Sequence, residues 1–285
     1  MHDITPWCKT VKGETLLHRA CINGQLKRTR YLIETYPEML HMVDNFKRTP
    51  AHHAAVRGNV SVLQYLIEQG TNPWCRTSEE ETFLHTACIE GELDMTKYLV
   101  GMYPKMLYDM DRNKYTPAHH AAVSGSVDVL RYLIDHCADP WCLTAEGETL
   151  LHIACLYGQL EIAEYLVQLD PQMLHEVDNS NSTPAHHAAA NGNVAVLRYI
   201  LNSGANPWCR TSEEETLLHR SCIKGELEMI KYLVETYPKM LHERDKSKNT
   251  PAHYAAESGN VAVLTYLIDS GIRHLSKTLC CTEHA

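Results

Sequence analysis

The chain has 285 residues, a formal net charge of −9 and a pI near 6.0, which argues against a nucleic-acid-binding surface because such a surface needs clustered Lys and Arg. No stretch approaches the ~18 consecutive apolar residues of a membrane span, and the first residues lack the pattern of a secretion signal. We therefore expect a cytoplasmic or nuclear protein, not a secreted one, with no membrane or nucleic-acid partner.

Two related stretches alternate along the chain. One reads Thr-Pro-Ala-His-His-Ala-Ala and the other Glu-Thr-Leu-Leu-His-x-Ala-Cys, with small variations between copies. Their shared threonines are spaced alternately by 34 and 33 residues, at positions 15, 49, 82, 116, 149, 183, 216 and 250. A unit this short cannot bury a core of its own, so the chain length counts stacked repeats rather than globular domains.

Each unit predicts two short antiparallel helices. Thr49 is placed to cap the first helix through its hydroxyl, and Pro50 takes the first helical position, where its missing N–H costs nothing. Gly58 ends this helix, and apolar residues at helical spacing predict a second helix that ends at Gly70. The polar segment 76–81 leads to the next threonine and suits an extended, β-hairpin-like connection.

The seven-residue stretch, taken together with Gly58, resembles the ankyrin-repeat signature Thr-Pro-Leu-His-x-Ala-Ala-x-x-Gly, a family with a period of 33 residues. The resemblance covers about residues 10 to 270, although Ala replaces the family's Leu and four units lack the Pro. It implies an all-α solenoid of helix-turn-helix units joined by β-hairpin-like loops, in a single domain over residues 1–285. We expect eight repeats and a C-terminal tail over residues 271–285, the repeats starting near residues 10, 44, 77, 111, 144, 178, 211 and 245.

Histidine and cysteine recur together, which raises the possibility of zinc binding. Adjacent helical residues point about 100° apart, so a pair such as His52 and His53 is not a preformed chelate. The resemblance implies that the first His of each unit is structural, hydrogen-bonding near the start of the first helix. We interpret the second His, at positions 53, 120 and 187, as a packing residue between repeats.

Eight of the eleven cysteines also recur at two fixed points of the repeat, which is typical of packing positions. We expect buried, reduced thiols at these points, which are Cys8, Cys75, Cys142 and Cys209, and then Cys21, Cys88, Cys155 and Cys222. Because Cys, His and Glu come in copies at matching positions, no single constellation differs from its surroundings as an active site would. We expect no catalysis, no metal and no cofactor.

The tryptophans recur every 67 residues, at positions 7, 74, 141 and 208, which indicates duplication of a two-repeat block. They have two interpretations: each packs at the base of a connection, or together they form an aromatic row that grips a peptide. Because Pro-Trp-Cys does not vary between copies, whereas binding positions should diversify, packing is favoured.

In the family that the chain resembles, the loop tips and the ends of the first helices line the binding face. The tips here alternate in charge, from Phe46-Lys47-Arg48 to the glutamates at 79–81 and on to Arg112, and the helix ends vary most between copies. We predict a non-catalytic module, acting as scaffold, adaptor or inhibitor, that binds a protein partner on this concave face; the alternative is a self-associating homo-oligomer. The predicted contact residues are Phe46, Arg48, Arg57, Glu79, Glu81, Glu90, Arg112, Tyr115, Tyr157, Glu213, Lys224 and Lys246.

Overall fold

The computed structural model describes the backbone of residues 7–282 and the side chains of residues 7–271. All regular secondary structure in this range is helical, as predicted, and no β-strand forms within it. By its internal contacts the chain divides into two compact units, Met1–Ala145 and Glu146–Ala285.

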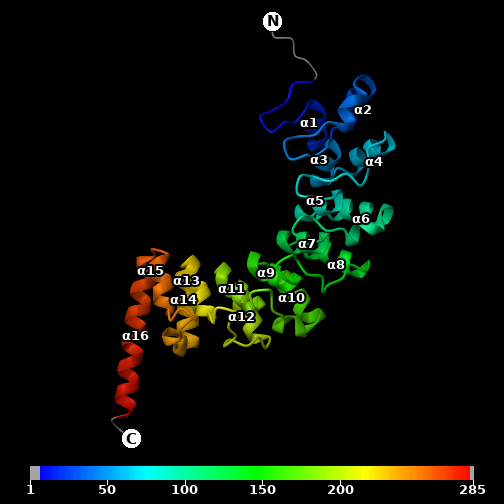
Figure 1. Ribbon diagram of the computed structural model, residues 1–285. Helices are drawn as coiled ribbons and strands as arrows, with labels where there is room; N and C mark the ends of the chain where they lie inside the picture. Colours follow the sequence, from blue (N-terminus) through cyan, green and yellow to red (C-terminus); the bar gives the residue numbers. More distant parts are fainter. Residues whose placement is uncertain (1–6, 283–285) are drawn as a thin grey trace. The chain divides into compact units, whose positions relative to one another are not determined.

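The first unit consists of four helix pairs stacked one after another (Figure 1). The first and third pairs are each followed by a short 3₁₀ helix. The elements are α1 (Leu16–Ile22), α2 (Leu26–Thr35), η1 (Pro37–His41), α3 (Pro50–Val56), α4 (Val60–Glu68), α5 (Phe83–Ile89), α6 (Leu93–Met102), η2 (Pro104–Tyr108), α7 (Pro117–Ser124) and α8 (Val127–Asp135).

The second unit repeats this plan. Its last helix continues without a break to Thr282, so the described part of the expected C-terminal tail is helical (Figure 1). The elements are α9 (Leu150–Tyr157), α10 (Leu160–Leu169), η3 (Pro171–His175), α11 (Pro184–Asn191), α12 (Val194–Asn202), α13 (Leu217–Lys224), α14 (Leu227–Thr236), η4 (Pro238–His242), α15 (Pro251–Glu257) and α16 (Val261–Thr282).

Each first helix starts with the same reciprocal cap. At α3, the backbone N–H of Thr49 donates to Nδ1 of His52 at 3.1 Å, and the hydroxyl of Thr49 lies 2.9 Å from the same nitrogen. Each side chain therefore accepts a hydrogen bond from a backbone N–H that would otherwise have no partner at the start of the helix. The helix itself is thin, because Ala54 and Ala55 are fully buried against neighbouring helices.

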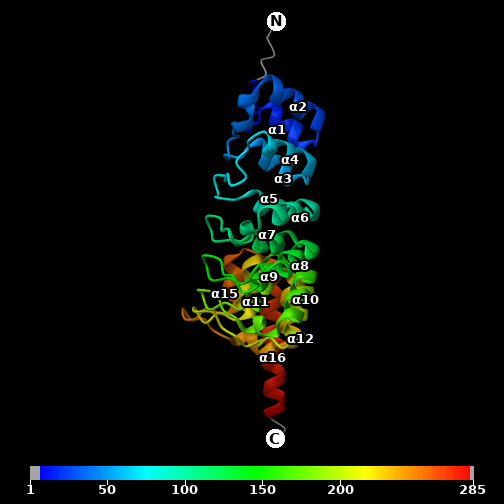
Figure 2. The same ribbon diagram turned by 90° about the vertical axis from the view of Figure 1, so that its right-hand side faces the viewer.

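The loops that precede the first helices are hairpin-like in hydrogen bonding but too short to count as strands. In the loop before α3, the N–H of Lys47 donates to the carbonyl of Asp44 and the N–H of Asp44 donates to the carbonyl of Arg48. Within the first unit these loops project on one side of the helices, and α6 and α8 lie on the other side (Figure 2). Lys47 has a φ of 57°, in the left-handed region; the matching loops of two other repeats carry glycine there, Gly13 and Gly147, and the remaining five carry other residues with positive φ.

Neighbouring loops are joined by one backbone hydrogen bond each. The N–H of Asn45 donates to the carbonyl of Lys12 at 3.0 Å, and the N–H of Ser78 donates to the carbonyl of Phe46 at 2.8 Å. The second unit has the same link, from Ser212 to the carbonyl of Ser180 at 2.8 Å. The loop tips therefore form a continuous edge within each unit.

Candidate protein-interaction surface

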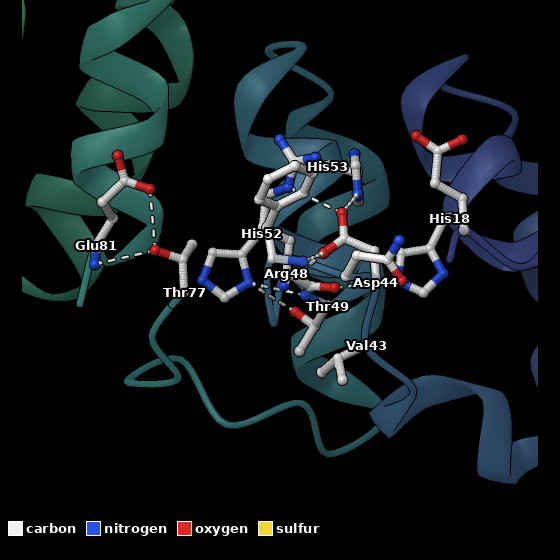
Figure 3. Close-up of polar contacts among 12 residues, drawn as sticks. His18, Val43, Asp44, Arg48, Thr49, His52, His53, Thr77 and Glu81 are labelled. Atoms are coloured by element: carbon white, nitrogen blue, oxygen red, sulfur yellow. Dashed lines mark hydrogen bonds and ion pairs between the residues drawn. The ribbon is translucent and has the colours of Figure 1, made fainter. Parts of the chain in front are cut away.

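The loop before α3 is organised by the carboxylate of Asp44, whose side chain has no exposed surface. Its Oδ1 accepts the backbone N–H groups of Phe46 at 2.8 Å and Arg48 at 2.9 Å. Its Oδ2 accepts Nε of Arg48 at 2.9 Å and lies 3.1 Å from Nε2 of His53, on the following helix (Figure 3). Four hydrogen bonds to one buried carboxylate hold the loop in one shape.

The ionisation of this group follows from its partners. Burial opposes the charge of Asp44, but the backbone N–H groups of Arg48 and Phe46 and the Arg48 guanidinium outweigh it and lower the pKa of Asp44. Burial, and next the charge of Arg48, lower the pKa of His53 against the pull of Asp44. At neutral pH a neutral His53 therefore donates its Nε2–H to an ionised Asp44.

The ring of His53 also connects two repeats, because it packs edge-on against His18 with the centroids 5.3 Å apart. Nδ1 of His18 accepts the N–H of Thr15 at 3.1 Å, and its Nε2 donates to the carbonyl of Arg48 at 3.1 Å, so its partners fix the neutral tautomer. The same stack recurs in the pairs His120 with His85, His187 with His152, and Tyr254 with His219. The second histidines thus lie between repeats, as the sequence predicts.

Five of the cap histidines are held in the neutral form. Burial lowers the pKa of His18, His152 and His186 to about 4, and that of His52 and His85 to about 3. A histidine with so low a pKa is a poor general base at neutral pH. These groups act as caps.

The recurring cysteines are of two kinds. Those on the first helices, Cys21, Cys88, Cys155 and Cys222, are buried as expected, whereas Cys75, Cys142 and Cys209 are half-buried and Cys8 is exposed. Sγ of Cys142 lies 3.6 Å from Nδ1 of His119, but burial raises the pKa of this thiol to about 11, so it is not an activated nucleophile. Among the side chains of residues 7–271, no group of three or more His, Cys, Asp or Glu is arranged to hold a metal ion.

Phe46 stands at the tip of the loop before α3 and is 51% exposed. The guanidinium of Arg48 lies over its ring, 4.9 Å from the centroid, and Asp44 in turn holds Arg48. The matching tip positions of the other seven repeats are all polar: Lys12, Glu79, Asn113, Glu146, Ser180, Glu213 and Ser247. An exposed aromatic ring at this position is therefore a feature of the second repeat only.

Comparison with known proteins agrees with this geometry. The family model described as ankyrin repeats (3 copies) matches residues 2–77, 66–144, 136–211 and 206–278, which together span nearly the whole chain. The chain belongs to the ankyrin-repeat family. The ankyrin repeat domain of human ASB11 has the same fold, with a TM-score of 0.63 at 22% identity over 77% of this chain and 97% of that domain.

The curated relatives that the chain matches are much longer proteins. Alpha-latrocrustotoxin-Lt1a of Latrodectus tredecimguttatus is 26% identical over 92% of this chain, and the transient receptor potential cation channel subfamily A member 1 homolog of Caenorhabditis elegans is 29% identical over 70%. This chain spans only 19% and 16% of those two proteins. Ankyrin repeats are generally protein-interaction modules, and in the described part of this chain no helix is long and apolar enough to cross a membrane.

In the first ankyrin unit, several predicted contact residues are occupied within the fold. Arg48 is tied to Asp44, and Glu81 is half-buried and accepts a hydrogen bond from the hydroxyl of Thr77 at 2.9 Å. Tyr115 is half-buried, with its ring 5.4 Å from His119 and 5.6 Å from His120. These three side chains support the loops more than they offer a free surface.

The other predicted residues of the first unit are exposed. Arg57 and Glu90 follow the last residues of α3 and α5, where they cap the helix ends. Glu79 and Arg112 lie on adjacent loop tips and form an ion pair at 3.4 Å, with more than half of each side chain exposed. The structure thus brings Phe46 and Arg48 together, and Glu79 and Arg112 together, as two separate pairs.

In the second ankyrin unit, Tyr157 ends α9 and is 48% exposed. Lys224, at the end of α13, donates to the carbonyl of Asn191. Glu213 and Lys246 lie on adjacent tips, 3.9 Å apart, in an exposed ion pair that repeats the arrangement of Glu79 and Arg112. Of these, Tyr157 is the largest exposed apolar surface.

Sequence reasoning missed the aspartates that organise the even-numbered loops, although the signal was present. An Asp precedes the second His by nine residues in each copy, at positions 44, 111 and 178, and Asp245 precedes Tyr254 by the same spacing. Their Oδ2 atoms lie 2.9–3.1 Å from the ring nitrogen or hydroxyl. The odd-numbered loops use threonine instead: the hydroxyl of Thr77 accepts the N–H groups of Glu79 and Glu81, both at 3.2 Å.

Proposed function

We propose that this chain is a non-catalytic protein-binding module, serving as a scaffold, adaptor or inhibitor. Its first unit binds a protein partner with the loop of the second repeat and the neighbouring first-helix ends, and Phe46 is the anchor. The observation that carries this proposal is the exposed ring of Phe46 at a tip position that is polar in every other repeat. Large aromatic side chains dominate the energetics of protein interfaces.

The scaffold does not need the ring. Ser180 occupies the same position in the sixth repeat, and its N–H and carbonyl make the same loop hydrogen bonds as those of Phe46. What the scaffold supplies is rigidity, because Asp44 holds both the backbone of the loop and the guanidinium that covers one face of the ring. A preorganised aromatic group loses little conformational entropy when it binds, which favours affinity.

The chemistry elsewhere supports binding rather than catalysis. The buried histidines have pKa values lowered to about 3 or 4, and burial raises the pKa of the Cys75, Cys142 and Cys209 thiols. An enzyme would need a base or nucleophile whose pKa is matched to its task. The pKa values of these histidines and thiols are instead shifted away from neutral pH, in the direction that makes them weaker bases and nucleophiles.

The test uses a variant that the chain itself provides. Replacing Phe46-Lys47-Arg48 by the Ser-Asn-Ser of positions 180–182 (F46S/K47N/R48S) copies a loop that folds in the sixth repeat. Quantitative affinity capture from the native source should lose a defined set of partners with this variant, while its thermal unfolding stays close to that of the parent chain. An unchanged set of captured proteins, with the fold intact, would exclude this loop as the binding surface.

A second candidate function is self-association. The tryptophans Trp74 and Trp208 lie in identical stretches and are 41% and 42% exposed, although each ring also contacts a tyrosine, Tyr103 or Tyr237, at 6.2 and 6.0 Å. Such equivalent apolar surfaces at regular spacing favour contacts between copies. Light scattering across a range of concentrations decides: a constant monomer mass would rule out assembly.

A further inference from the structure

Three exposed cations of the first two repeats have no carboxylate within ion-pair distance among the described side chains. They are Lys12 at the tip of the first repeat, Lys47 beside Phe46, and Arg57 at the end of α3. Of the other charges nearby, Arg48 is paired with Asp44 at 2.9 Å and Arg19 with Glu14 at 3.5 Å, and Nζ of Lys9 donates to the carbonyl of Val43 at 3.3 Å. The nearest described acids without an ion pair, Glu90 and Glu92, belong to the third repeat. The unpaired charge on the loops of the first two repeats is therefore positive, in a chain whose net charge is −9.

The backbone places Lys12 and Lys47 beside the loop tip that carries Phe46, and Arg57 at the far end of the following helix. The carbonyl of Lys12 accepts the N–H of Asn45, the residue directly before Phe46. Lys47 follows Phe46 in the left-handed conformation, with a φ of 57°. Arg57 follows Val56, the last residue of α3, so it lies about 10 Å along the helix from the end of the loop.

The fold does not require the positive charge. In the second unit the positions that match Lys12, Lys47 and Arg57 hold Glu146, Asn181 and Asn191. The loop there keeps the same hydrogen bonds, and the N–H of Asn179 donates to the carbonyl of Glu146 as Asn45 does to Lys12. Since the same scaffold accepts neutral or acidic residues, the cations serve something other than folding.

We infer that the partner segment bound by the first and second repeats is an acidic stretch of polypeptide with an apolar residue that packs against Phe46. This inference rests on the proposed function and adds the chemistry of the partner to it. Unpaired cations attract carboxylates; Lys12 and Lys47 beside the apolar ring match a charged rim around an anchor, and Arg57 extends the positive charge along α3. Charges of this kind mainly raise the rate of encounter and set which partner is accepted.

A nucleic acid fits this surface less well than a polypeptide. The third repeat places the exposed Glu80 and Glu90 next to the basic region. Adjacent repeats pack at about 10 Å, which is about one Debye length at physiological salt, so these acids act on any ligand that extends past the second repeat. A strand with a phosphate at every nucleotide meets them, whereas a polypeptide can confine its acidic residues to one stretch.

The experiment selects ligands for the whole chain from a random-peptide phage library and measures the affinities of the selected peptides by fluorescence anisotropy. Two variants are compared, the neutralised K12Q/K47Q/R57Q and the loop exchange F46S/K47N/R48S. The control K97Q/K105Q/K239Q removes three exposed lysines that lie outside the proposed surface. We expect peptides rich in Asp and Glu around an apolar residue, bound about 10- to 30-fold more weakly by the neutralised variant and within about twofold by the control.

The outcomes separate the two proposals. The selected peptides could be neutral or basic, and bind the neutralised variant but not the loop exchange. That result would contradict the inference of an acidic partner and leave the proposed function standing. Peptides that bind all variants equally would overturn both. An oligothymidine that binds more tightly than the selected peptides, and is lost with the neutralised variant, would replace the polypeptide by a nucleic acid.

Discussion

The loops of the second and sixth repeats share their buried residues and differ in their exposed ones. Both begin with an aspartate whose Oδ2 lies close to a histidine nine residues later, at 3.1 Å from His53 and 2.9 Å from His187. Lys47 and Asn181 adopt nearly the same left-handed φ, 57° and 56°. Yet the tip changes from Phe46 to Ser180, so the conformation of the loop is set by the buried aspartate and histidine and leaves the tip free to vary.

The largest expected effect is a fall in the free energy of unfolding in acid, to which both loops contribute alike. Each of the two loops leads into a helix whose first turn contains a cap histidine, His52 in α3 and His186 in α11. Burial lowers the pKa of His52 to about 3 and that of His186 to about 4, below the ordinary value of 6.5. The unfolded chain therefore takes up protons first, and stability that is complete above about pH 6.5 is lost as the pH falls toward about 4, by about 1.4 kcal/mol per pH unit for each such histidine.

Three further cap histidines, His18, His85 and His152, have similarly lowered pKa values, so the losses add along the chain. Urea unfolding followed by circular dichroism at about pH 7, 6 and 5 measures this slope. Equal stability at the three pH values would show that the caps are not the neutral, buried groups described.

The next effect in size comes from removing the aspartate that the two loops share. Asp44→Ala leaves two backbone N–H groups and the ring N–H of His53 without their acceptor, which we expect to lower the free energy of unfolding by about 3 kcal/mol. Asp178→Ala removes the corresponding bonds, to Ser180, Ser182 and His187, and should give a similar loss.

Urea unfolding of both variants, beside Asp139→Ala as a control, tests this equivalence. Asp139 starts a different, exposed turn, where it accepts only the N–H of Trp141. A loss at Asp44 without a loss at Asp178 would mean that the exposed residues, rather than the aspartate, hold the second-repeat loop.

A smaller effect is expected when the exposed residues are exchanged. The F46S/K47N/R48S variant loses the ion pair of Arg48 with Asp44 and the contact of Arg48 with the ring, which together should cost about 1 kcal/mol of unfolding free energy or less. Asp44 keeps its backbone bonds and His53. Unfolding in urea measures the change, and a loss above about 2 kcal/mol would make Phe46 and Arg48 part of the core of the loop rather than its exposed tip.

The repeat architecture could be predicted from the sequence because its determinants are local and recur. Thr49, Pro50 and His52 lie within one turn of helix and form the cap that their spacing implies. The candidate surface was only partly predictable. Phe46 is exposed as expected, but Tyr115 is half-buried because its side chain turns toward His119 and His120, and the sequence alone does not show which loop residues fold inward.

The smallest effect concerns the left-handed residue that both loops contain. A lysine at φ 57° is strained by its Cβ, so Lys47→Gly should raise the free energy of unfolding by about 0.5–1 kcal/mol, whereas Asn181→Gly should change it by less, because asparagine tolerates this conformation. The reverse change, Gly13→Ala, puts a Cβ 2.5 Å from Oδ1 and 2.9 Å from the backbone N of Asn45 and should destabilise. Thermal unfolding of the three variants measures the order. If Asn181→Gly gained as much as Lys47→Gly, the backbone alone, and not the side chain at this position, would determine the strain.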